Sequence, residues 1–202
     1  MLKKYVVIFL LCMFYKNICN AQKFVNKASL QLCKTIGDLN IDSLADFITV
    51  EQDTIDKFKR YTLKVFFAIK SGGYNLVAAS DSVIQPQYPY GNGYSTDTFF
   101  DTVTIEKGII IISTELIRGG YQHKFRYQNN KFELIGFHSV NSDGHRFSEE
   151  RDFNLSTGVM VVKVKNYETD KIVSNKKSKI NINPLPSLQK FTPLSSMYDY
   201  KF

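Results

Sequence analysis

The sequence has no tryptophan and only three cysteines among its 202 residues, at positions 12, 19 and 33. The first two lie in the leader described below, so the rest of the chain carries one thiol, Cys33. A single cysteine excludes an internal disulfide, even in an oxidising compartment. Because Cys33 lies in an apolar pattern with no histidine near it in sequence, we expect a buried and unreactive thiol.

Long apolar runs are also scarce, and the run at residues 6–14 reads VVIFLLCMF. It is about half as long as the ~20 apolar residues that a membrane-spanning helix needs. Lysines at positions 3 and 4 precede it, and small side chains at Cys19 and Ala21 follow it. This pattern predicts a secretory signal peptide over residues 1–21. The alternative is that the segment stays attached as a membrane anchor.

A large excess of charge is missing as well. The formal net charge is +7, and removal of Lys3, Lys4 and Lys16 with the leader lowers it to +4. A net positive charge this small, in an exported protein, does not favour nucleic acid as a partner. The chain is 44% hydrophobic and 14% aromatic, which is typical of a globular domain with its own core.

The region after residue 46 predicts one β-strand after another. At residues 121–128 the side chains of Tyr121, His123, Phe125 and Tyr127 alternate with polar ones, so they share one face of a strand. Similar runs bounded by turn signals predict strands at residues 47–50, 61–70, 74–79, 99–106, 109–116, 132–140, 146–155 and 159–165, with 171–179 as a last edge strand.

The predicted fold class is therefore all-β, a mainly antiparallel meander in which consecutive hairpins form one sheet. A single domain spans residues 22–182. It begins with a short helical segment at residues 24–34, supported by Ala28, Leu30 and Leu32, and it ends in an extended, proline-containing tail at residues 183–202. No transmembrane segment is expected in the mature chain.

One loop has the spacing of a metal ligand set. An EF-hand-type loop has oxygen ligands at positions 1, 3, 5, 7 and 9, which here are Asp38, Asn40, Asp42, Leu44 and Asp46. Leu44 offers its carbonyl oxygen and the other four offer side-chain oxygens, so the spacing predicts bound Ca²⁺. Position 6 is a serine instead of glycine, and position 12 is a threonine instead of glutamate. The alternative is an ion-free loop held by Asx-turns.

The segment IGDLNIDSLADFITV resembles the GDLNGDGLxDxxxV segment of FG-GAP and VCBS-type repeats. Three further segments, GNGYSTDTFFDTVTIEKG, KFRYQNNKFELIGFH and RDFNLSTGVMVV, resemble a family of exported bacterial proteins of unknown function. The resemblance implies that Asp38, Asn40, Asp42 and Asp46 are metal ligands, and it supplies no catalytic residues.

Known catalytic motifs are missing: the chain has no nucleophile elbow, HExxH, P-loop or CxxC. Of the three histidines, His123 is expected to pack half-buried, whereas His138 and His145 meet diagonally across a hairpin, without a third zinc ligand. The cluster of Glu149, Glu150 and Asp152 fits either a glycosidase-like carboxylate pair or surface ion pairs with Arg151 and Lys163.

The segment at residues 86–94 carries three tyrosines, Tyr88, Tyr90 and Tyr94, among prolines and glycines. Exposed tyrosines on a stiff loop can stack on sugars or anchor a protein partner, and the alternative is that they fold back onto the sheet. The sequence thus favours a non-enzymatic binding or envelope-associated protein, periplasmic or extracellular, with an unknown envelope or extracellular ligand. The alternatives are an envelope polysaccharide hydrolase and an inhibitor or structural envelope protein.

Overall fold

The computed structural model describes residues 28–193, and over this range the chain forms β-strands and no helix. The signal-peptide prediction for residues 1–21 lies outside the described residues. The strands are β1 (Ser29–Gly37), β2 (Asp46–Asp53), β3 (Tyr61–Ala68), β4 (Tyr74–Ser80), β5 (Thr98–Glu106), β6 (Ile109–Leu116), β7 (Gly119–Gln128), β8 (Lys131–Ser142), β9 (Phe147–Asn154), β10 (Val159–Asn166) and β11 (Ile172–Lys179).

Within each stretch β1–β4 and β5–β11, every strand pairs antiparallel with the next one along the chain, which confirms the predicted antiparallel pairing of consecutive strands. The prediction of one sheet is wrong, because the strands form two sheets, β1 to β4 and β5 to β11. The chain changes sheets over residues 81–97, where Pro86 and Pro89 cannot donate to a strand ladder. At the junction β1 lies against β5, and a Cβ at Gly37 would come within 2.6 Å of Ile105 Cγ2.

The predicted helix at residues 24–34 is wrong for the part that the structure describes. Residues 29–34 belong to β1, which pairs with β2 from Ser29 onwards, whereas residues 24–27 lie outside the described range. The register shifts between Gln31 and Cys33, so Leu32 is an extra residue in a β-bulge. The bulge interrupts the two-residue alternation, and this is why the apolar residues of β1 did not resemble a strand.

Two of the tight turns have the backbone that their sequences predict. Asn129 and Asn130 have φ angles of 53° and 58°, and Lys107 and Gly108 have 50° and 76°. Positive φ at both central residues gives the turn twist that matches the flanking strands of a hairpin. Asparagine and glycine tolerate this conformation best, so local sequence fixes the register of β5 with β6 and of β7 with β8.

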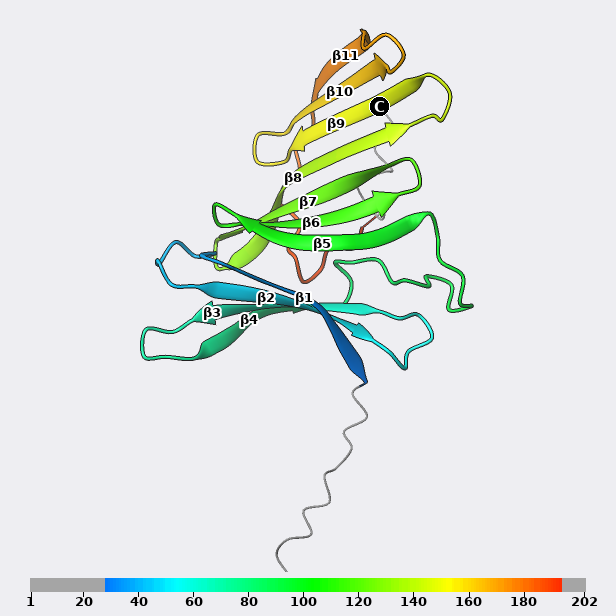
Figure 1. Cartoon of the computed structure of the whole chain (residues 1–202). Helices are drawn as coiled ribbons and strands as arrows, with labels where there is room; N and C mark the ends of the chain where they lie inside the picture. The colour runs from blue at the N-terminus through cyan, green and yellow to red at the C-terminus, as the bar shows by residue number, and fades with distance from the viewer. Residues whose placement is uncertain (1–27, 194–202) are drawn as a thin grey trace, which may run out of the picture.

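The core lies between the two sheets, where the inward-facing residues of both meanders meet. Its fully buried side chains include Ile48, Val50, Leu63 and Val65 from the four-stranded sheet and Ile110, Ile112, Phe125 and Leu134 from the seven-stranded sheet. Figure 1 shows β5 to β7 over the four-stranded sheet, whereas β9 to β11 extend beyond it. Part of the inner face of the larger sheet therefore needs another cover.

The chain after β11 provides this cover. Leu188 is 0% and Phe191 3% exposed, and both belong to the core cluster. The Leu188 N–H donates to the carbonyl of Phe132 (2.9 Å), and the Leu134 N–H donates to the carbonyl of Pro186 (2.8 Å). Leu188 and Phe191 are thus part of the core, whereas Asn183, Pro184, Gln189 and Lys190 of the same segment are exposed. Residues 194–202 lie outside the described range.

His123 is the most unusual residue of this core. It is 1% exposed, and its ring lies 4.7 Å from the Phe191 ring and 5.3 Å from the Phe137 ring, centroid to centroid. Neither ring nitrogen has a hydrogen-bond partner among the described residues. Burial without a partner disfavours the charged imidazolium and lowers the pKa of His123 to about 3. His123 is therefore more deeply buried than the half-buried position that the sequence predicts.

Because His123 is buried in its neutral form, we expect the fold to lose stability in mild acid. In the unfolded chain its pKa is about 6.5, so between about pH 6.5 and 3 the unfolded state binds the extra proton. Above pH 6.5 His123 does not lower the free energy of unfolding. Below this pH it lowers the free energy of unfolding by about 1.4 kcal/mol per pH unit. Between pH 7.5 and 5 we expect the free energy of unfolding to fall by about 2 kcal/mol less in His123→Leu than in the wild type, as measured by urea unfolding. The exposed His145→Gln serves as the control, and equal pH profiles for wild type and His123→Leu would contradict the prediction.

Candidate functional site

The aspartate-rich loop at residues 38–45 joins β1 to β2 and is held by its own side chains. Asp38 Oδ1 accepts a hydrogen bond from the Ile41 N–H (2.7 Å), and Asp38 Oδ2 accepts one from the Ser43 N–H (2.9 Å). Asp42 Oδ1 accepts from the Leu44 N–H (2.8 Å). Ser43 adopts a φ of 67°, the left-handed conformation that glycine usually provides at this position.

Asp46 ends this loop and is fully buried, with 0% of its surface exposed. Its Oδ2 accepts from the Leu39 N–H (2.8 Å), and its Oδ1 accepts from the Ala68 N–H at the end of β3 (2.9 Å). The carboxylate therefore ties the start of the loop to the third strand. Asn40 bonds to Asp42 through its amide nitrogen, 3.0 Å from Oδ2. Calcium binding by this loop stays a prediction.

The tyrosine segment lies in the connection between β4 and β5. Tyr90 and Tyr94 are 74% and 75% exposed, whereas Tyr88 is half-buried. The base of the segment is fixed, because the Tyr88 N–H donates to the Phe58 carbonyl (3.0 Å) and Gln52 Nε2 donates to Gln87 Oε1 (2.8 Å). The long connection is therefore anchored to the turn between β2 and β3.

A groove of about 500 Å³ lies beside this segment. Its lining combines apolar rings with polar and charged groups from three parts of the chain, namely Arg60, Asp81, Ser82, Gln85, Pro86, Pro89, Thr192 and Pro193. The predicted binding tyrosines are not among these lining residues. They belong to the same segment, whose prolines form one side of the groove.

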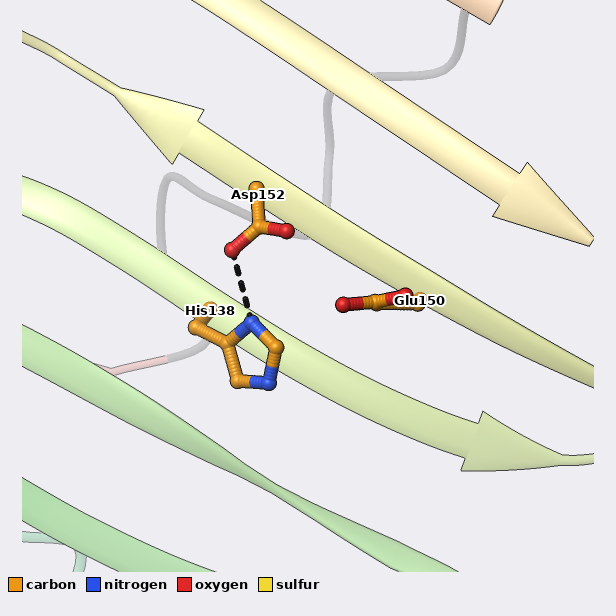
Figure 2. A group of neighbouring side chains, drawn as sticks. All are labelled: His138, Glu150 and Asp152. Atoms are coloured by element: carbon orange, nitrogen blue, oxygen red, sulfur yellow. Dashed lines mark hydrogen bonds and ion pairs between the residues drawn. The ribbon is translucent and has the colours of Figure 1, made fainter. Parts of the chain in front are cut away.

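A second cluster lies on the outer face of the seven-stranded sheet. His138 of β8 is directly opposite Asp152 of β9, and its Nδ1 lies 2.8 Å from Asp152 Oδ1 (Figure 2). Glu150 is opposite Val140, on the same face, and its carboxylate points toward the imidazole. One ligand atom from each of the three lies within 4.8 Å of the others.

The sequence identified the members of this cluster but did not bring them together. The predicted strand ends at residue 140, which sets His138 diagonally across from His145, whereas β8 continues to Ser142 and pairs His138 with Asp152. His145 is not part of the cluster. Glu150 has the predicted Lys163 as a neighbour, with 3.7 Å between Oε2 and Nζ. A hydrolytic role for Glu150 and Asp152 stays a prediction.

Sequence reasoning missed an aromatic cluster on the outer face of the four-stranded sheet. The Phe47 ring stacks on Phe66, with 4.5 Å between centroids, and meets the edge of Tyr74 at 4.6 Å. Lys34 Nζ lies 4.2 Å from the Phe47 centroid. The three rings come from β2, β3 and β4, so only the strand registers, which pair Phe47 with Phe66, reveal that they are neighbours.

Comparisons of the chain with protein-family models, curated proteins and solved structures find no match. The resemblance to FG-GAP and VCBS-type segments therefore stays a prediction. Within residues 28–193 there is no helix of the length and apolarity that crossing a membrane requires. The fold defines the chain as a two-sheet antiparallel β protein, and its sites define candidate surfaces for binding.

The buried carboxylate of Asp46 gives a direct test of how the loop is held. Asp46→Asn replaces one accepting oxygen with an N–H₂ group that faces a backbone donor, so a buried N–H loses its partner. We expect the free energy of unfolding to fall by about 2–4 kcal/mol in urea unfolding. Asp42→Asn changes an exposed carboxylate of the same loop and is expected to lower it by less than about 1 kcal/mol. Equal losses in the two variants would contradict the assignment.

Proposed function

We propose that this protein is an exported binding protein that recognises an envelope or extracellular ligand through the surface formed by Tyr90, Tyr94 and the groove beside them. The observation that carries the proposal is that both tyrosines stand exposed on a segment whose base is fixed by hydrogen bonds. The signal-peptide pattern of residues 1–21 supports an exported protein.

A fixed segment favours binding because little conformational freedom remains to be lost. Val83 and Ile84 are buried in the core, at 1% and 3% exposed, so the segment is anchored at its start as well as at Tyr88. Preorganised loops bind with less loss of entropy than mobile ones. Tyrosine adds a large, rigid and amphipathic contact with only two rotatable side-chain bonds.

The groove supplies the second half of the surface. Pro86, Pro89 and Pro193 present apolar rings, and Arg60 and Asp81 place charges of both signs beside them. Binding sites typically combine apolar walls with a few polar groups that fix orientation. A ligand with flat apolar faces and hydroxyl or amide groups, such as an envelope glycan chain, fits both parts.

The two tyrosines are expected to contribute most of the affinity. Removal of a well-placed aromatic anchor usually costs more than about 1 kcal/mol, so the double change Tyr90→Ala and Tyr94→Ala should weaken binding about 10- to 30-fold. The measurement is retention of the purified protein by glycan isolated from the cell envelope of its host. Tyr167→Ala is the matched control, because Tyr167 is also exposed but lies at the turn after β10. Equal retention of wild type and the double variant would contradict the proposal.

A further inference from the structure

The cluster of His138, Glu150 and Asp152 has a composition that suits a metal ion. It offers one imidazole nitrogen and two carboxylate oxygens, all on the outer face of β8 and β9 (Figure 2). Imidazole nitrogen suits zinc and other first-row divalent ions, whereas calcium and magnesium prefer an all-oxygen shell. Two carboxylates supply the negative charge that balances a divalent cation.

The distances are compatible with coordination after small side-chain rotations. Bonds of about 2.0–2.1 Å in a tetrahedral site place ligand atoms about 3.3 Å apart. The Nδ1 to Oδ1 distance of 2.8 Å is already close to this value, and the widest separation in the cluster stays within 4.8 Å. The side chains of His138, Glu150 and Asp152 are 30%, 41% and 52% exposed, so they have room to turn.

The interactions that an ion must replace are weak. The exposed pair between His138 and Asp152 is worth at most about 1 kcal/mol, as is usual for ion pairs at a protein surface. Lys163 Nζ lies 3.7 Å from Glu150 Oε2, beyond hydrogen-bond distance. Lys124 and Asp152 line the same hollow of about 220 Å³.

The surroundings of His138 on the side of a second hollow favour a cation. His138 also lines a hollow of about 260 Å³, whose described lining includes the carboxylates Asp101 and Glu115 and no lysine or arginine. Carboxylates beside a site raise the local concentration of cations. This hollow gives an approaching ion, or a ligand of that ion, access from the side of the imidazole.

We propose that His138, Glu150 and Asp152 form a binding site for one divalent transition-metal ion of the zinc class. Three protein ligands leave at least one position of a tetrahedral shell for water or an external ligand, as in zinc sites that are not purely structural. The site lies on the seven-stranded sheet, away from the residues that line the tyrosine groove, so it does not depend on the proposed recognition surface.

Isothermal titration of the metal-free purified protein with ZnCl₂ tests this site. We expect one equivalent of Zn²⁺ to bind, and His138→Gln to weaken binding at least about tenfold. His145→Gln, at an exposed histidine outside the cluster, should leave the affinity unchanged within about twofold. Titration with CaCl₂ should give the same result for the wild type and His138→Gln, because Ca²⁺ prefers an all-oxygen shell and does not need the imidazole.

Glu150→Gln separates loss of a ligand from loss of structure, because Glu150 takes no part in the hydrogen bond between His138 and Asp152. It should also weaken Zn²⁺ binding at least about tenfold while the thermal unfolding midpoint without metal stays unchanged. Three results would overturn the proposal: no saturable Zn²⁺ binding to the wild type, equal affinity of the wild type and His138→Gln, or loss of binding in His145→Gln.

Discussion

The inner face of the seven-stranded sheet has to be removed from water, and the four-stranded sheet covers only part of it (Figure 1). Residues 183–193 add to this cover, because Leu188 and Phe191 belong to the core cluster and Phe191 packs on His123 and Phe125 of β7. Burial of the Leu188 and Phe191 side chains contributes about 1.5–3 kcal/mol each. The same contacts enclose His123, so the segment that closes the core also creates its least favourable environment.

The candidate surfaces follow from this arrangement. The closing segment ends at Thr192 and Pro193, which meet the connection between β4 and β5 and form one wall of the groove. Ser82 Oγ donates to the Phe191 carbonyl (3.0 Å), so the two walls are joined by a hydrogen bond. On the outer face of the seven-stranded sheet, antiparallel pairing brings together side chains that are far apart in sequence, such as His138 and Asp152.

Local sequence was sufficient for the hairpins β5–β6 and β7–β8, because alternation and the turns at Gly108 and Asn130 define each hairpin without distant contacts. It was insufficient where tertiary contacts decide. The bulge at Leu32 interrupts the alternation by which β1 would be identified as a strand. The division into two sheets depends on core contacts that no single segment reveals. At the candidate metal site, the sequence contains all three residues, but a strand predicted to end at residue 140 does not pair His138 with Asp152. The aromatic cluster of Phe47, Phe66 and Tyr74 requires two registers at once, which local patterns do not supply.

The role of Leu188 and Phe191 as part of the core is the claim on which the rest depends. Native-state hydrogen exchange of the Leu188 amide, which donates to the Phe132 carbonyl, tests it most directly. If the segment belongs to the core, this amide exchanges only through global unfolding, as slowly as the Ile112 amide of β6. Exchange of Leu188 as fast as the amide of Ile55, in the exposed turn after β2, would contradict the account.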